Sequence, residues 1–382
     1  MEFFSFKRFK KNSESVALFD IGATTVGGAF AHMVEGKSPV IYYATRVAVL
    51  PHEGEAPLPA MIRALHEVCA LLVAEGAPTL RREVGDAHIH RIEASIGAPW
   101  QESEIEVKSM QRDKPFMFSH EFMATASAPS KPLPEGRTLS GRDVVATVLN
   151  GYETTSPFGK KVKRADLVIL SSTLETEAQY EVERTLRHSF HTHSVSITAF
   201  APVAYAVFRD VFAHQKDYIV LDISGMSTDA AFIKRGLLMG VSSIPTGLTD
   251  LLSSLDGEKT ASSLGSGLID RERNTKLAAR IAKSKAKWIE ELRDVLGEFS
   301  SRQPLPRTVF IIADPFARDF LKKLLDSSTL RSLWLSDEPL GVIPVAPQHF
   351  APFVQTRGTA EGDLYLSMLA LFHTKRPKGE LS

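Results

Sequence analysis

The sequence has little of several features that would mark a function class. It holds one cysteine, Cys69, in 382 residues, so it cannot form an internal disulfide or a cysteine-rich zinc site. Lys plus Arg number 45 and Asp plus Glu number 45, so no net charge attracts nucleic acid. It has no run of 18 apolar residues, and residues 1–11 lack the apolar core of a signal peptide. We therefore expect a cytoplasmic protein that binds no nucleic acid.

Short catalytic motifs are also missing. The sequence contains no G-x-x-x-x-G-K-[ST], no H-E-x-x-H and no G-x-S-x-G, so P-loop NTPase, zinc-protease and α/β-hydrolase mechanisms have no anchor. His188, His191 and His193 lie close together, but no Cys or Glu stands at zinc-ligand spacing around them. We interpret them as surface histidines.

What is present is the composition of a globular protein. Hydrophobic residues make up 43% and charged residues 24% of the chain, which is enough for a sizeable core. The length of 382 residues corresponds to roughly two to three domains. Apolar patterning predicts strands mixed with helices along the whole chain, which indicates an α/β or α+β class. Within this pattern we expect residues 105–108 to pair with a strand at 88–96.

One local pattern occurs twice. Asp20-Ile21-Gly22-Ala23-Thr24-Thr25 lies between two apolar runs, which predicts a β-hairpin with the acid and the glycine at its turn. Asp222-Ile223-Ser224-Gly225-Met226-Ser227-Thr228-Asp229 repeats this arrangement about 200 residues later. A supersecondary unit that returns at domain-sized spacing indicates an internal duplication.

Each turn has the groups of a phosphate clamp. Glycine lets backbone N–H groups approach phosphate, hydroxyls add donors, and an acid holds Mg²⁺ directly or through water. The alternative is an ordinary hairpin turn with Asp and Gly in their usual roles. The candidate nucleotide-binding residues are Asp20, Gly22, Thr24, Thr25, Asp222, Gly225, Ser227 and Thr228, with Asp20 and Asp222 as candidate Mg²⁺ ligands.

The paired turns resemble the two phosphate loops of the actin, Hsp70 and sugar-kinase superfamily. Within it the sequence is most similar to the FtsA and PilM type, because residues 92–96, Pro157-Phe158-Gly159 and residues 165–172 look like the small inserted subdomain of FtsA. The resemblance implies a two-lobed α/β fold of duplicated RNase H-like domains with an inserted SHS2-like subdomain.

The resemblance also implies a division of the chain. Residues 1–14 would be a leader and 376–382 a polar tail, with the first lobe at 15–87 and 173–215, the insert at 88–172 and the second lobe at 216–375.

Two departures from the family pattern bear on its cofactor. Met226 stands where the second phosphate loop has glycines, and Ala313-Asp314-Pro315 replaces the Gly-Gly pair of the adenosine loop. A side chain at the first place and a residue without N–H at the second hinder close backbone approach. The ATP or ADP site with Mg²⁺ that the resemblance implies is therefore weakened or lost.

Two function classes follow from the resemblance. The first is a scaffold at the inner face of the cell membrane, for cell division or type IV pilus assembly, which binds copies of itself or the cytoplasmic tail of a membrane protein. The second is an active ATPase or sugar kinase in which Asp20 and Asp222 organise Mg²⁺. Whether the scaffold serves division or the pilus stays open.

The N-terminal leader offers a membrane contact of its own. Residues 1–11 mix four phenylalanines with four basic residues, a composition suited to an anionic membrane surface. At about three helical turns, the segment could equally be an inert leader. The tail at 375–382 lacks the pattern of an amphipathic membrane helix.

Overall fold

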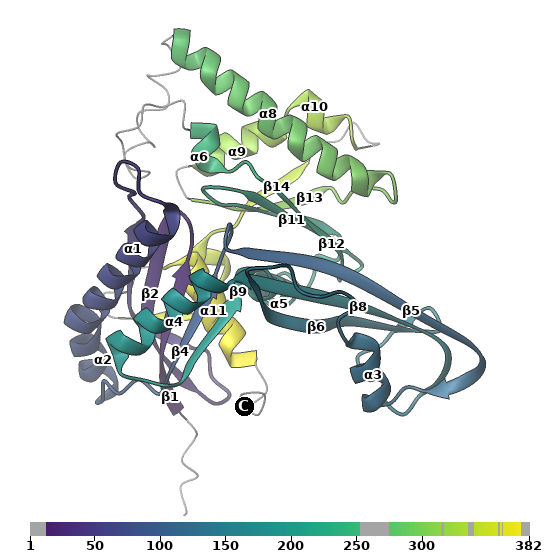
Figure 1. The fold of residues 1–382 in the computed structure, drawn as a ribbon, viewed down its shortest axis with the longest axis horizontal. Helices are drawn as coiled ribbons and strands as arrows, with labels where there is room; N and C mark the ends of the chain where they lie inside the picture. The colour runs from purple at the N-terminus through teal and green to yellow at the C-terminus, as the bar shows by residue number, and fades with distance from the viewer. Residues whose placement is uncertain are drawn as a thin grey trace, which may run out of the picture.

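The chain builds three β-sheets. The computed structural model describes residues 13–252, 275–314, 317–334, 340–357, 360 and 362–375. The sheets have six, five and four strands, and Figure 1 shows the first at the lower left, the second above it and the third as an arm to the right. Most of the predicted leader and the whole predicted polar tail lie outside the described residues.

The six-stranded sheet is made mainly by the N-terminal part of the chain. Its order is β15-β3-β2-β1-β4-β9, in which β1 pairs antiparallel with β2 and parallel with β4. Both faces of β1 are buried, because Ala17 and Phe19 join one core and Val16 and Leu18 the other. The strands are β1 (Ser13–Ile21), β2 (Thr25–Val34), β3 (Val40–Ala48), β4 (Arg91–Ile96), β9 (Val195–Ala199) and β15 (Gln355–Thr356).

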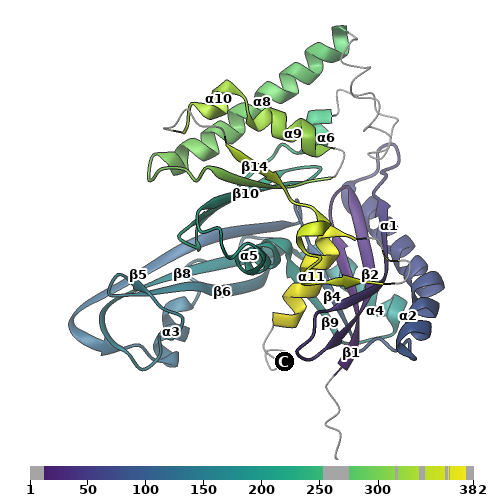
Figure 2. The ribbon, with the colours of Figure 1, turned by 180° about the vertical axis from the view of Figure 1, so that it is seen from behind.

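Helices cover both faces of this sheet. On the outer face lie α1 (Pro57–Leu71), the π-helical turn η1 (Leu72–Gly76), α2 (Ala77–Val84) and α4 (Thr176–Phe190). On the inner face lie α5 (Phe200–Val211) and α11 (Leu364–Lys375), as Figure 2 shows from behind. The helical run Pro57–Val84 is long and apolar enough to cross a membrane, but its apolar side packs on the sheet as a core helix does.

The five-stranded sheet repeats the first one. Its order is β12-β11-β10-β13-β14, with two antiparallel and two parallel pairings in the same sequence as β3-β2-β1-β4-β9. The internal duplication predicted from the two turns is therefore present. The strands are β10 (Tyr218–Ile223), β11 (Thr228–Lys234), β12 (Leu237–Ile244), β13 (Thr308–Ile312) and β14 (Gly341–Pro344).

The second sheet is also covered on two sides. Tyr218 and Val220 share the core of α5 and α11, so these two helices lie between the sheets. The outer core holds Leu221 and Trp288, beneath α6 (Leu248–Leu252), α8 (Thr275–Ser300), α9 (Arg318–Leu325) and α10 (Ser328–Arg331). A short 3-10 turn, η4 (Pro347–His349), connects this sheet to β15.

The four-stranded sheet interrupts the first lobe between β4 and α4. It has the order β5-β8-β6-β7 and its own small core around Phe118 and Leu167, against α3 (His120–Ser127). Its strands are β5 (Gln101–Met117), β6 (Arg137–Leu149), β7 (Tyr152–Glu153) and β8 (Lys161–Glu175). The predicted unit 88–172 includes β4, which the structure places in the six-stranded sheet.

One predicted pairing is wrong. Residues 105–108 do not pair with the strand at 88–96; they belong to β5 and pair with β8. Strand β4 already has β1 and β9 as neighbours, so no edge remains for a third partner.

Candidate functional site

The first duplicated turn closes on itself. It joins β1 to β2, and the Gly22 N–H donates to the Thr25 carbonyl at 3.0 Å. Asp20 lies one residue before the end of β1 and is buried, with its Oδ1 accepting from Ser95 Oγ at 3.4 Å. The predicted β-hairpin is present, and the carboxylate of Asp20 lies near the end of its first strand.

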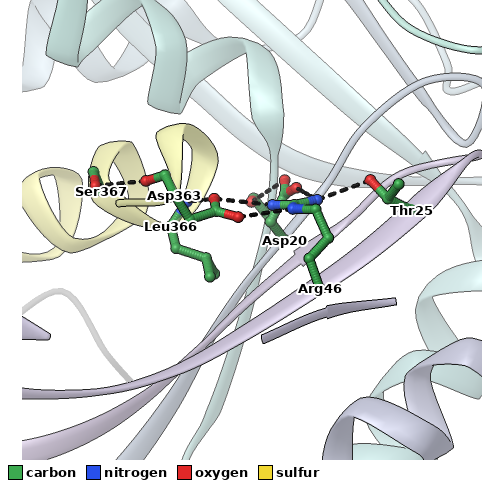
Figure 3. Close-up of polar contacts among 7 residues, drawn as sticks. Asp20, Thr25, Arg46, Asp363, Leu366 and Ser367 are labelled. Carbon is green, nitrogen blue, oxygen red and sulfur yellow. Dashed lines mark hydrogen bonds and ion pairs between the residues drawn. The ribbon is translucent and has the colours of Figure 1, made fainter. Parts of the chain in front are cut away.

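Arg46 on β3 binds this carboxylate (Figure 3). Its Nη1 lies 3.0 Å from Asp20 Oδ2 and donates to Thr25 Oγ1 at 2.9 Å. Its Nε and Nη2 donate to the two carboxylate oxygens of Asp363 at 2.7 and 3.0 Å. This second pairing is the two-pronged arrangement in which arginine binds carboxylates most strongly.

Gly27 makes room for the guanidinium. In the sheet, Asp20 stands opposite Gly27 and Gly27 stands opposite Arg46, so the three residues form one row across β1, β2 and β3. A Cβ atom on Gly27 would lie 2.6 Å from Arg46 Nη2. The glycine is therefore needed for the side chain of its neighbour.

Asp363 holds the other side of Arg46 and begins the last helix. Its Oδ1 accepts the Leu366 N–H at 2.9 Å, and its carbonyl accepts from Ser367 Oγ at 2.6 Å, so it caps α11 (Figure 3). The ring of Tyr365 lies under the Arg46 guanidinium, 5.1 Å from its centroid to Cζ. Arg46 thus fastens α11 to the first sheet.

Burial and charge act in opposite directions on these acids. Burial raises the pKa of Asp20 to about 6, and Arg46 opposes the rise. Burial also works against ionised Asp363, but the charge and hydrogen bonds of Arg46 hold its pKa below the ordinary value. The difference agrees with the geometry, because Asp363 takes two guanidinium hydrogen bonds and Asp20 takes one.

The second turn uses its polar groups internally. The Ser224 N–H donates to the Ser227 carbonyl at 3.0 Å, and the Ser227 N–H to Ser224 Oγ at 3.2 Å. Thr228 is buried, and its hydroxyl donates to the Thr246 carbonyl while accepting from Trp288 Nε1. The serine hydroxyls of this turn therefore bond within the turn, and the Thr228 hydroxyl bonds to buried neighbours.

Asp222 lies in an acidic surrounding. It stands opposite Asp229 in the β10–β11 pair, and burial, then Asp229, then Asp20 and Asp314 raise its pKa well above the ordinary value. Burial also raises the pKa of Asp229, which accepts a hydrogen bond from Gln101 Nε2 at 3.3 Å. The predicted Mg²⁺ ligands Asp20 and Asp222 are thus near one another, and among the described residues an arginine pairs with Asp20 but not with Asp222.

The two turns lie against each other. A Cβ atom on Gly225 would lie 2.0 Å from Cγ2 of Thr24, and one on Gly247 would lie 2.5 Å from the Ser227 nitrogen. Of the candidate residues in the first turn, Thr24 thus contacts Gly225 of the second turn directly. Within the described residues, no three His, Cys, Asp or Glu side chains are grouped so as to hold a metal ion.

Arg46 and Asp363 were not among the predicted site residues. Each has a local signal, since Arg46 is a charge among the mainly apolar residues 40–49 and Asp363 stands just before an apolar helix. Nothing local says that they meet, because they are separated by 317 positions.

A second feature is a cavity of about 550 Å³ below the turns. It lies between the four-stranded sheet, α5 and strands β10 to β12, and segment 129–134 borders it. Its walls are mainly apolar, with Asp222 and Asp229 among the exceptions. Representative lining residues are Ile105, Leu170, Ala204, Phe208, Val220 and Leu238.

Arg142 ties the residues just before the border segment to the sheet. It donates to the Ser127 carbonyl at 2.6 Å, and it also bonds Glu106 and Ser171. Hydrogen bonding to Arg142 lowers the pKa of Glu106. The side of the cavity wall that the four-stranded sheet provides is therefore held by contacts within that unit.

Comparisons with known proteins identify the fold. No family model and no curated protein matches the sequence. Among solved structures, a PilM-PilN type IV pilus biogenesis complex is similar with a TM-score of 0.60 at 15% identity, over 96% of this chain and 99% of that chain.

Two more distant structures were also found. A Bacteroides thetaiotaomicron protein with an actin-like ATPase fold and unknown function has a TM-score of 0.45 at 8% identity, over 97% and 99% of the two chains. The ethanolamine utilization protein EutJ from Carboxydothermus hydrogenoformans has a TM-score of 0.39 at 13% identity, over 96% and 92%.

The predicted fold class is confirmed. The chain has the actin-like α/β fold, and it is similar over nearly its whole length to a chain of the PilM-PilN complex structure.

Proposed function

We propose that this protein is a scaffold of type IV pilus assembly that holds the cytoplasmic segment of a membrane protein. The observation that carries the proposal is the similarity to a PilM-PilN complex over nearly the full length of both chains. A cavity bordered by the four-stranded sheet supports it, because an apolar hollow of this size accommodates several side chains of a bound peptide. Cell division stays the less supported alternative.

The cavity suits an extended peptide with apolar side chains. Phe208 and Val220 offer apolar walls, and Asp222 and Asp229 give one end a negative character if either is ionised. Apolar residues would then bind in the hollow, while a basic or amide group would be favoured near the acids.

The location of the protein follows from the same proposal. A cytoplasmic protein that binds the tail of a membrane protein is held at the inner face of the membrane by its partner. The basic, Phe-rich residues 1–11, outside the described residues, would add a peripheral contact with anionic lipid. Self-association would bring several such contacts together on one assembly.

The test is binding of a fluorescent peptide that copies the cytoplasmic segment of a PilN-like membrane protein. We expect saturable binding by fluorescence anisotropy, and a loss of at least about tenfold with Ala204→Trp, whose indole would fill the cavity from α5. Ala70→Trp, on an exposed position of α1, is the matched control and should bind as the wild type does.

Two results would contradict the proposal. Equal binding by the wild type and Ala204→Trp would remove the cavity as the docking place. No binding of the peptide to the folded wild-type protein would count against the pilus scaffold itself.

A further inference from the structure

The actin-like fold implies that a magnesium nucleotide binds between the two turns. The residues there can be compared with the groups that such a ligand needs. A bound metal needs free carboxylate oxygens, and a phosphate needs free N–H and hydroxyl donors. Three independent observations at Asp20 and in the two turns argue against such a ligand.

The first reason is that Asp20 is already paired. Its Oδ2 contacts Arg46 Nη1 at 3.0 Å, and its Oδ1 accepts from Ser95. The hydroxyl of Thr25 accepts from the same Arg46 nitrogen at 2.9 Å. A cation at Asp20 would have to displace a guanidinium that already supplies the positive charge.

The second reason is that three backbone N–H groups of the turns, those of Gly22, Ser224 and Ser227, are used within the turns. The Gly22 N–H binds the Thr25 carbonyl, and the Ser224 and Ser227 N–H groups bind across their own turn. Leu248 and Thr249 N–H groups bind the carbonyls of Ser224 and Gly225 at 2.7 and 2.8 Å. The two turns are therefore stabilised by their own contacts instead of by a phosphate.

The third reason is space. The methyl group of Thr24 lies where a Gly225 side chain would begin, so the turns contact each other directly. The phosphates of a nucleotide held from both sides need the volume that this contact fills.

Arg46 is not free to swing aside at little cost. Asp363 binds it with both oxygens, and Asp363 is itself fixed by capping α11. Removing the guanidinium would leave Asp363 and Asp20 as buried carboxylates without their cation, which is strongly unfavourable.

We infer that Arg46 is the resident cation of this cleft, so that the two lobes close without nucleotide. The Arg46 guanidinium neutralises Asp20 and Asp363 where the fold family places a magnesium nucleotide. The inference goes beyond the proposed scaffold function and does not depend on it, because a peptide can bind in the cavity whether or not a nucleotide binds between the turns.

The first test uses the full wild-type chain. We expect no heat of binding with Mg-ATP or Mg-ADP, and a thermal midpoint that moves by less than about 1 °C at millimolar nucleotide. Saturable binding that Asp20→Asn abolishes would overturn the inference, whatever the result of the peptide assay. This measurement needs no destabilised variant.

The second test removes the cation. We expect Arg46→Met to lower the thermal midpoint by about 5 °C or more, and Mg²⁺ or Ca²⁺ to recover part of the loss, because the freed carboxylates then attract a divalent ion. Arg63→Met, which breaks the more exposed pair with Glu55, is the matched control, with a smaller loss and no response to either ion.

Each result of the second test has a meaning. A wild-type midpoint for Arg46→Met, with no response to divalent ions, would contradict the role of Arg46. If that variant does not fold, Arg46→Lys retains the charge but lacks the two-pronged geometry, and its midpoint should lie below that of the wild type. A midpoint for Arg46→Lys equal to the wild type would again contradict it.

Discussion

The two duplicated hairpins differ in one row of residues. In the first sheet, the row across β1, β2 and β3 reads Asp20, Gly27, Arg46. In the second sheet, the equivalent row across β10, β11 and β12 reads Asp222, Asp229, Ser243. The backbone pairing is the same in both.

The chemistry of the middle position decides the difference. Gly27 leaves space, so the arginine of the third strand reaches the acid of the first. Asp229 instead puts a second carboxylate beside Asp222, so that burial and then Asp229 raise the pKa of Asp222, while burial raises that of Asp229. One copy of the motif has thus become an ion pair and the other an acidic wall of the cavity.

Filling the first row gives the largest expected effect. Gly27→Val should lower the free energy of unfolding by about 3 kcal/mol, because its side chain would displace the guanidinium from both carboxylates. Valine favours strands, so propensity cannot explain the loss. Chemical denaturation measures it.

Asp229→Val makes the matched change in the second row. It should cost much less, because it removes a like charge and displaces no arginine. Equal losses in the free energy of unfolding for Gly27→Val and Asp229→Val would show that the two rows do not differ in what they contribute to stability.

Separating the two turns should have an intermediate effect. Gly225→Ala places a methyl group against Thr24 and should cost about 2 kcal/mol by overpacking. Thr24→Ser removes the opposing methyl group, so the double variant should recover most of that loss. A double-mutant cycle from denaturation curves gives the coupling, and purely additive effects would mean that the turns do not touch in solution.

Neutralising Asp222 in the second row should give the smallest effect, which is an increase in the free energy of unfolding. The pKa of Asp222 is raised in the folded protein, so between about pH 4 and that pKa the unfolded chain loses the proton first and stability falls as pH rises. Asp222→Asn removes this loss. We expect a gain of about 1 kcal/mol at pH 8 and almost none at pH 4, by denaturation at both pH values.

A surface control separates this effect from general charge removal. Asp113→Asn changes an exposed acid on β5 and should leave stability within about 0.5 kcal/mol at both pH values. A gain for Asp222→Asn that is the same at pH 4 and pH 8 would contradict the explanation from proton binding.

The local parts of the fold could be predicted from the sequence. Both hairpins follow from an apolar run, an acid, a glycine and a second apolar run, and their return along the chain predicts the repeated topology. Strand β5 was harder, because most of its side chains are exposed and it therefore lacks the apolar alternation of a half-buried strand.

The partners within the site could not be predicted in the same way. Arg46 is 26 positions from Asp20 and 317 from Asp363, and only the folded sheet brings the three together. The hydroxyl of Thr228 looked available from its place in the turn, but α8 delivers Trp288 to it. A sequence pattern shows which polar groups a turn contains. Whether those groups already have partners depends on segments that are distant in the sequence.

The pairing of Arg46 with Asp363 also has a consequence for biosynthesis. A ribosome makes β1, β2 and β3 early, but β15 and α11, which complete the same lobe, are made near the end of the described chain. During most of translation the nascent first sheet has its arginine and its inner apolar face without their final partners. The lobe whose synthesis begins first is therefore completed late. By the time β15 and α11 join it, the strands of the second sheet have already been synthesised.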